Sequence, residues 1–132
     1  MEQLKNKYEV VQNTITALEL GIQRFHKYNQ EDYEYEAFRE SLIQRFEYTI
    51  DTFWKCLKIQ KLMVDVASPR GVFRAAAEAK LINHQELNQL LDATTDRNLS
   101  SHAYDEDTAE QVTKRIPHHY LIIKSVFERI KL

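Results

Sequence analysis

The chain contains almost none of the residues that interrupt helices. Its 132 residues include only two glycines, Gly21 and Gly71, and two prolines, Pro69 and Pro117. Folds rich in β-strands need many turns, and turns rely on these two residue types. We therefore expect long helices joined by few connections. A chain of this length is sufficient for one domain with its own hydrophobic core, so residues 1–132 are predicted to form a single helical domain.

Hydrophobic periodicity predicts where the first two helices lie. From residue 4 to residue 25, apolar side chains recur at alternating steps of four and three, which predicts an amphipathic helix over about 2–29. A second helix is predicted over about 35–62, with an apolar face too broad for a single neighbour. The residues of that second face are Phe38, Leu42, Ile43, Phe46, Ile50, Phe53, Trp54, Cys56 and Leu57.

Capping signals predict the next two helices. Ser68 can cap a helix that has Pro69 in its first turn, which predicts a short helix over about 69–81. Asn83 and Glu86 have the spacing of a capping box, with Asn in place of the usual Ser or Thr. They predict a fourth helix that ends near 97–102.

The acidic run 105–107 favours the start of a last helix, because negative charge opposes the helix dipole there. This segment runs to about 131, and Pro117 is expected to kink or break it. The fold class predicted is all-α: an up-down bundle of about five helices, four-helix-bundle-like, with two long antiparallel helices and shorter pieces.

Charge and composition exclude several classes of function. The formal net charge is −2, so no overall basic field attracts nucleic acid, and any contact with RNA must be local or supplied by a partner. No apolar run approaches the ~18 residues of a membrane span, and no signal peptide is visible. With the lone Cys56 taken as a core residue, these features predict a cytoplasmic protein that does not contact membranes. There is no CxxC, HExxH or phosphate-binding glycine loop, so neither a metal site nor a cofactor is expected.

The segment 97–104, RNLSSHAY, carries the strongest chemical signal. Arginine can bind a phosphate with a rigid fork of donors, and histidine can move a proton near neutral pH, so Arg97 and His102 suit phosphodiester chemistry. On one continuous helix, five residues turn the chain by about 500°, and the two side chains would point about 140° apart. Either the helix loosens at Ser100 and Ser101, or a second subunit supplies the missing partner.

RNA cleavage without a metal is the reaction that fits this pair, because RNA carries its own nucleophile in the 2′-hydroxyl. His102 would remove that proton or protonate the leaving oxygen, and Arg97 would stabilise the charge of the transition state. Tyr104 would stack on a base, donate a hydrogen bond or present its hydroxyl for modification.

Structural interpretations of the same residues remain open. Arg97 can pair with Asp92, Asp96 or the C-terminus of its own helix. His102 can be a surface residue at a turn, and Tyr104 can pack its ring before the last helix.

Other charged residues are weaker candidates. Adjacent His118 and His119 point in different directions on a helix, and His119 falls on an apolar stripe, where a buried, hydrogen-bonded histidine is expected. Arg39, Arg45 and Glu47 can line a groove, although a solvated helix face is the default interpretation.

Three stretches resemble the HEPN superfamily. Residues 97–104 match its R-x4-H-x-Y pattern, and the chain looks more narrowly like the HepT group, also described as nucleotidyltransferase substrate-binding proteins. The other two stretches are IQRFEYT at 43–49, followed by Trp54 and Lys55, and SPRGVFRAA at 68–76. The likeness spans roughly residues 10–130, and the three stretches in this order are more specific than R-x4-H alone.

The resemblance implies a HEPN-like helical domain that forms a homodimer and works with a small nucleotidyltransferase, MNT or MntA, encoded nearby. One description of the group gives RNA-cleaving toxins, held in check by an antitoxin that attaches AMP to the motif tyrosine. It implies that Arg97 and His102 are catalytic, that Asn98 and Ser101 support them, and that Tyr104 is the AMP acceptor or a partner contact. The alternative description gives a non-catalytic substrate-binding subunit of a two-component nucleotidyltransferase.

Overall fold

The computed structural model of the protein describes residues 2–102 and 104–131, with side chains described from residue 7 onward. Within these residues the chain is all-α, as predicted. Its helices are α1 (Glu2–Phe25), α2 (Tyr35–Cys56), α3 (Pro69–Glu78), α4 (His84–Leu99) and α5 (Glu106–Ile130). A π-helical segment, η1 (Leu57–Leu62), continues α2, and a 3-10 turn, η2 (Ser100–His102), continues α4.

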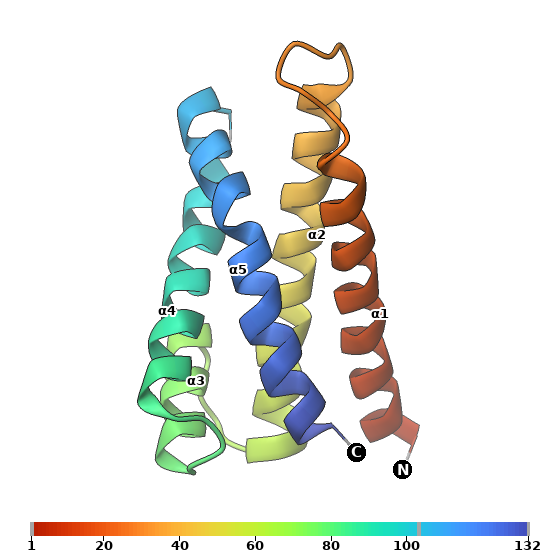
Figure 1. Ribbon diagram of the computed structural model, residues 1–132. Coiled ribbons are helices and arrows are strands. Elements are labelled where there is room, and N and C mark those ends of the chain that lie inside the picture. The colour runs from red at the N-terminus through yellow and green to blue at the C-terminus, as the bar shows by residue number, and fades with distance from the viewer. Residues whose placement is uncertain (1, 103, 132) are drawn as a thin grey trace.

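Four of these helices form an up-down bundle. α1 and α4 run in one direction, α2 and α5 run in the other, and α1 begins at the same end of the bundle at which α5 ends (Figure 1). α3 is short and packs beside α4 and η1. The α4 helix contacts both α2 and α5, so its two sides face different neighbours.

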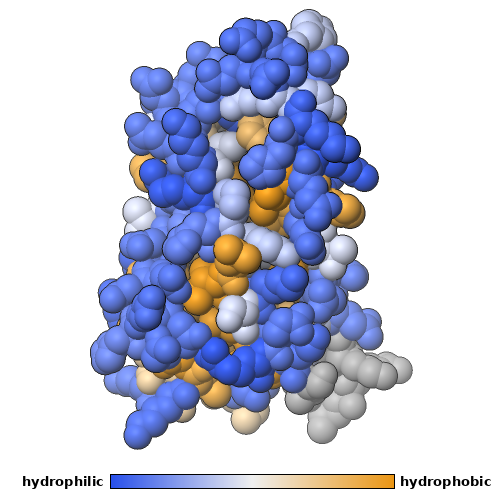
Figure 2. Space-filling model, viewed as in Figure 1, coloured by the Kyte–Doolittle hydropathy of each residue, from blue (hydrophilic) through white to orange (hydrophobic). Residues whose placement is uncertain are grey.

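The core lies along the shared axis of the bundle. The apolar stripe predicted on α1 is buried at Val11, Ile15 and Leu18, where it packs with the buried aromatic and aliphatic residues of the other helices. The face seen in Figure 2 is mostly hydrophilic, with apolar side chains showing between the helices. No described helix is both long enough and apolar enough to cross a membrane.

Side-chain caps fix the helix starts that the sequence predicted. The Ser68 hydroxyl accepts a hydrogen bond from the Gly71 amide at 3.1 Å. Asn83 and Glu86 form the reciprocal capping box of α4, and Asp105 caps α5 by accepting from the Thr108 amide at 3.3 Å. These caps satisfy amides that have no partner within the helix.

Pro117 does not break the last helix, which excludes one of the two outcomes expected for it, a kink or a break. α5 continues through it for 25 residues and is the longest helix described, so the bundle has three long helices rather than two. A proline inside a helix costs about 3 kcal/mol through one lost hydrogen bond and local crowding. Burial on both sides of Pro117, at Val112, Ile116, Ile123 and Val126, offsets that cost.

Candidate functional site

The end of α4 brings the predicted site residues together. The α-helix stops at Leu99, and the chain tightens into the 3-10 turn over 100–102. The Ser100 hydroxyl donates to the Arg97 carbonyl at 2.6 Å, and the Ser101 hydroxyl donates to the Asn98 carbonyl at 2.7 Å. Hydroxyl groups that bond nearby carbonyls favour such a tightening at a helix end. The α-helix therefore ends between Arg97 and His102, as expected at the two serines, although the turn that follows is tighter rather than looser.

A surface cleft of about 520 Å³ lies beside this turn. Both Arg97 and His102 line it, so one copy of the chain is enough to bring the guanidinium and the imidazole to the same cleft. The two residues predicted to support them, Asn98 and Ser101, line it as well. The other residues of its wall are Asp51, Trp54 and Lys55 of α2 and Pro69 of α3. We call this the motif cleft.

Arg97 is held by two carboxylates of α2. Its Nε lies 3.2 Å from Asp51 Oδ1 and its Nη2 lies 3.0 Å from Asp51 Oδ2, while Nη1 lies 3.1 Å from Glu47 Oε2. The Ser100 hydroxyl also contacts the Glu47 carboxylate. Hydrogen bonding to Asp51, with the charges of both carboxylates, raises the pKa of Arg97 against the opposing effect of burial. The side chain is still 31% exposed.

The acidic partners proposed for Arg97 from the sequence are therefore wrong. Asp96 faces α5 and not Arg97, because neighbouring residues of a helix point about 100° apart. The true partners lie 46 and 50 residues upstream. Asp51 and Glu47 stand four apart and so share one face of α2, which is the only trace that this pairing leaves in the sequence.

His102 and Tyr104 project from the surface next to each other. Tyr104 is 86% exposed, so its ring does not pack before α5, and that structural interpretation is wrong. The two rings meet edge to face, with 6.0 Å between their centroids. His102 is exposed as well as lining the motif cleft. Ala103, the motif residue between them, lies outside the described residues.

Asp96 forms a second charged cluster on the opposite side of α4, in which Asp96 and His119 are buried and the Arg115 side chain is 46% exposed. Its carboxylate oxygens lie 2.7 and 2.8 Å from the Arg115 guanidinium, and Oδ2 lies 2.6 Å from His119 Nε2. Burial opposes the ionisation of Asp96, but the hydrogen bonds from Arg115 and His119 outweigh it and lower its pKa to about 2. His119 is buried as expected, although its Nδ1 has no hydrogen-bond partner among the described residues.

The other candidates on α2 have different roles. Arg39 is buried and pairs with Glu110 of α5 at 2.8 Å, so the default of a solvated face is wrong for this residue. Arg45 donates to the Ala17 carbonyl of α1 at 2.7 Å. Of the three residues considered, only Glu47 contacts the motif arginine.

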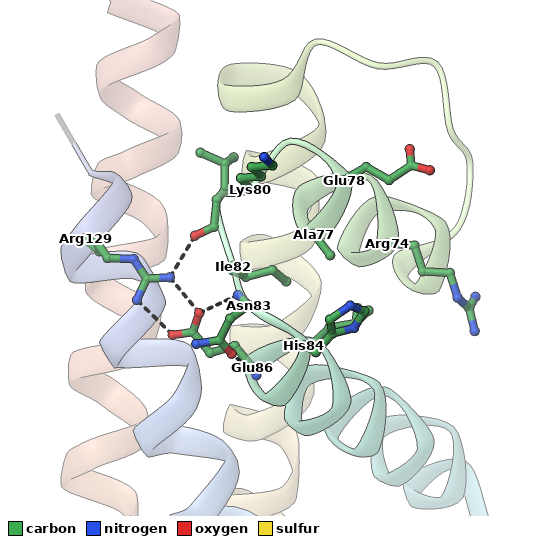
Figure 3. Close-up of a pocket in the computed structure, with 11 residues that line it drawn as sticks. Arg74, Ala77, Glu78, Lys80, Ile82, Asn83, His84, Glu86 and Arg129 are labelled. Carbon is green, nitrogen blue, oxygen red and sulfur yellow. Dashed lines mark hydrogen bonds and ion pairs between the residues drawn. The ribbon is translucent and has the colours of Figure 1, made fainter.

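A larger cavity, of about 780 Å³, lies where α3 turns into α4, and it contains none of the predicted site residues. Figure 3 shows Arg129 of α5 reaching across to Glu86 and to the Leu81 carbonyl. The hydrogen bond from Arg129 lowers the pKa of Glu86, whose carboxylate also accepts from the Asn83 amide at 2.9 Å. Arg129 and Glu86 thus pair with each other, and this ion pair connects the start of α4 to the end of α5.

Comparison with known proteins points to one family. The family described as nucleotidyltransferase substrate binding protein like matches residues 6–130. No curated protein matches the chain.

Solved structures share the fold. A protein from Thermus thermophilus is 29% identical, with a TM-score of 0.77 over 92% of this chain and 99% of that chain. A tri-AMPylated HEPN toxin of Shewanella oneidensis, in complex with an MNT antitoxin, is 19% identical, with a TM-score of 0.67 over 92% of this chain and 96% of that chain. A toxin–antitoxin structure with AMP-PNP is 20% identical, with a TM-score of 0.68 over 92% and 98% of the two chains. At these identities the two toxin structures establish a common fold.

Proposed function

The chain belongs to the nucleotidyltransferase substrate binding protein-like family, and we propose that it is the RNA-cleaving toxin subunit of a toxin–antitoxin pair. The antitoxin in this proposal is a small nucleotidyltransferase. One observation carries the proposal: Arg97 and His102, which no continuous helix could aim at one substrate, line the same solvent-open cleft. The fold shared with HEPN toxins supports the same assignment.

The proposed reaction is transesterification within the RNA strand. The 2′-oxygen of one ribose attacks the adjacent phosphorus, the bond from phosphorus to the 5′-oxygen of the next nucleotide breaks, and a 2′,3′-cyclic phosphate forms. His102 either accepts the proton from the 2′-hydroxyl or donates one to the departing 5′-oxygen. Arg97 stabilises the negative charge that gathers on the phosphate oxygens in the transition state.

Tyr104 is the proposed acceptor for control by the antitoxin. Its hydroxyl would attack the α-phosphorus of ATP and lose its proton, and pyrophosphate would leave. The exposure of Tyr104 gives the partner access, and its ring contact with His102 puts the new phosphate beside the motif cleft. A phosphate and purine at this position would obstruct the cleft and compete for Arg97.

A homodimer is part of the proposal. Two-fold symmetry repeats whatever lies near its axis, so two motif clefts placed face to face would line one longer channel for RNA. Exposed residues of α2 and α4 around the cleft provide the surface for this arrangement.

Expression in cells tests the proposal. We expect the wild-type chain to stop growth and degrade RNA, and His102→Ala and Arg97→Ala to do neither. His118→Ala, which changes an exposed histidine of α5 outside the cleft, is the matched control and should behave as wild type. Equal, harmless behaviour of wild type and His102→Ala would contradict the proposal.

A second function is favoured by the pairing of Arg97. Because Asp51 and Glu47 already neutralise the guanidinium, the chain can instead be a non-catalytic subunit that binds the substrate of a nucleotidyltransferase. That function predicts a stable complex with the enzyme, nucleotide transfer to a third molecule, and no RNA cleavage by either protein.

A further inference from the structure

The only tryptophan of the chain lines the motif cleft. Trp54 lies in the last turn of α2 and shares the cleft with Arg97 and His102. It is partly buried and packs against the hydrophobic core, which fixes the indole in place. A fixed aromatic ring therefore forms part of the wall next to the two candidate catalytic groups.

A cation and a second apolar surface accompany the indole. The Lys55 ammonium lies 5.8 Å from the centroid of the Trp54 ring, and Lys55 itself is exposed and lines the cleft. A cation in this position is attracted by the electron-rich face of the indole. The Pro69 ring, at the start of α3, provides another apolar part of the same wall. The cleft thus combines flat apolar surfaces with a charge on a flexible stem.

We propose that Trp54 is the stacking surface for an unpaired nucleobase, and that Lys55 binds a phosphate next to that base. This inference rests on the proposed function, and it identifies the part of the RNA that the motif cleft selects. Unpaired bases stack on aromatic side chains, whereas the strand backbone is bound by basic groups. The cleft volume, about 520 Å³, lies within the range of about 300–1,000 Å³ typical of small-molecule sites, so a nucleotide fits.

The same arrangement explains how a chain with a net charge of −2 can bind RNA. Asp51 and Glu47 both pair with Arg97, so the Lys55 ammonium, which makes no ion pair among the described residues, is the positive charge of the cleft that is left for a phosphate. Stacking of a base on Trp54 adds binding energy without requiring further positive charge on the protein. Duplex RNA hides its base faces, and we therefore expect the cleft to select single strands and loops.

Tryptophan fluorescence tests the assignment directly, because every signal comes from residue 54. The His102→Ala protein keeps RNA intact while it is titrated with a short single-stranded RNA, the same strand in a duplex, and AMP. We expect saturable quenching by the single strand, and much weaker responses to the duplex and to AMP. Equal quenching by AMP would identify a mononucleotide as the occupant and overturn the selection of a strand, and binding of the single strand without any quenching would overturn the stacking role.

Two substitutions separate stacking from mere apolar packing. Trp54→Phe keeps an aromatic ring, whereas Trp54→Leu keeps apolar volume without one, and circular dichroism checks that both fold. Because these variants lack the tryptophan, their binding is measured by the fluorescence anisotropy of a dye-labelled single strand. We expect Trp54→Leu to weaken binding of this strand by about 5- to 150-fold and Trp54→Phe to restore most of it. Tyr33→Ala, at an almost fully exposed position between α1 and α2 and outside the motif cleft, is the control and should bind as wild type. Equal losses in the Leu and Phe variants would overturn the proposal.

Failure of this inference is distinguishable from failure of the proposed function. If the wild type cleaves RNA and Trp54→Leu cleaves it with an unchanged KM, the stacking role is wrong and the nuclease assignment remains. If the wild type cleaves no RNA but a single strand quenches Trp54, the nuclease assignment is wrong and the binding site remains.

Discussion

Two neighbouring residues of α4 belong to charged clusters with opposite surroundings. Asp96 holds Arg115 and His119 of α5, and the side chains of Asp96 and His119 are only 5% and 2% exposed. Arg97 holds Asp51 and Glu47 of α2, and the Arg97 and Asp51 side chains are 31% and 35% exposed. The first cluster joins α4 to α5 through a buried carboxylate, whereas the second lies at the motif cleft.

The difference shows how one helix turn can serve both stability and function. A buried group such as the Asp96 carboxylate or the His119 ring is expensive to separate from its partner, because it does not regain its full hydration. Charges near the surface exchange partners at little cost, since water stabilises each of them. The buried Asp96 cluster therefore fixes the position of the turn, and the exposed Arg97 cluster is left free to change its contacts.

Removal of the Asp96 carboxylate should have the largest effect. Asp96→Ala leaves the His119 ring and the Arg115 guanidinium without their common acceptor, and we expect a loss of about 3 kcal/mol in the free energy of unfolding. Denaturant titration measures this loss. Asp92→Ala, at an exposed position of the same helix, is the matched control and should change stability by less than about 0.5 kcal/mol. Equal effects of the two substitutions would contradict the contrast between the buried and the exposed cluster.

The same carboxylate should make stability fall in acid. Folding lowers the pKa of Asp96 from 3.8 to about 2, so the folded state favours the ionised form. The resulting stabilisation, about 2 kcal/mol, is complete above about pH 5 and is lost as the pH falls through 4 toward 2 and below. Unfolding free energies of wild type and Asp96→Asn, measured over this range, should converge at the acid end. A constant difference between them would show that the ionisation of Asp96 contributes nothing.

Substitution of Asp51 should affect binding more than folding. Asp51→Asn weakens an exposed ion pair, so we expect a change of at most about 1 kcal/mol in stability. Because the amide competes less for the guanidinium, a His102→Ala protein that also carries Asp51→Asn should bind single-stranded RNA several-fold more tightly. Asp65→Asn makes the same change of net charge at an exposed site outside the motif cleft and is the control. A destabilisation as large as that of Asp96→Ala would show that the two clusters are equivalent.

Local signals predicted the helices far better than they predicted the charge pairs. The caps predicted at Ser68 and Asn83 follow from a few adjacent residues, and both are confirmed. Asp105, predicted only to favour a helix start by its negative charge, also caps α5 with its side chain. The break that was one of the two outcomes expected at Pro117 does not occur, because its local cost is offset by burial along α5, which depends on the whole bundle.

The surroundings of the site depend on distant parts of the chain. The turn between Arg97 and His102 was predictable, because its serines act on carbonyls three residues away. The pairing of Arg97 with Asp51 was not, because 46 residues separate them and only the packing of α4 against α2 selects that partner. The sequence identifies Trp54 only as part of the apolar face of a helix, because its place in the cleft depends on where the distant helices α3 and α4 pack.

Tyr104 should affect stability least of all, because its side chain is almost fully exposed. Tyr104→Phe removes only a hydroxyl, and we expect it to change the free energy of unfolding by less than about 0.5 kcal/mol. When the chain is incubated with the proposed nucleotidyltransferase partner and ATP, mass spectrometry should show added adenylate on the wild type and none at residue 104 of the variant. Tyr48→Phe, at another exposed tyrosine, is the control and should accept adenylate at Tyr104 as the wild type does. Adenylate found on Tyr48 and not on Tyr104 would contradict this prediction. It would show that the partner contacts α2, next to the carboxylates that hold Arg97, and not the exposed end of the motif.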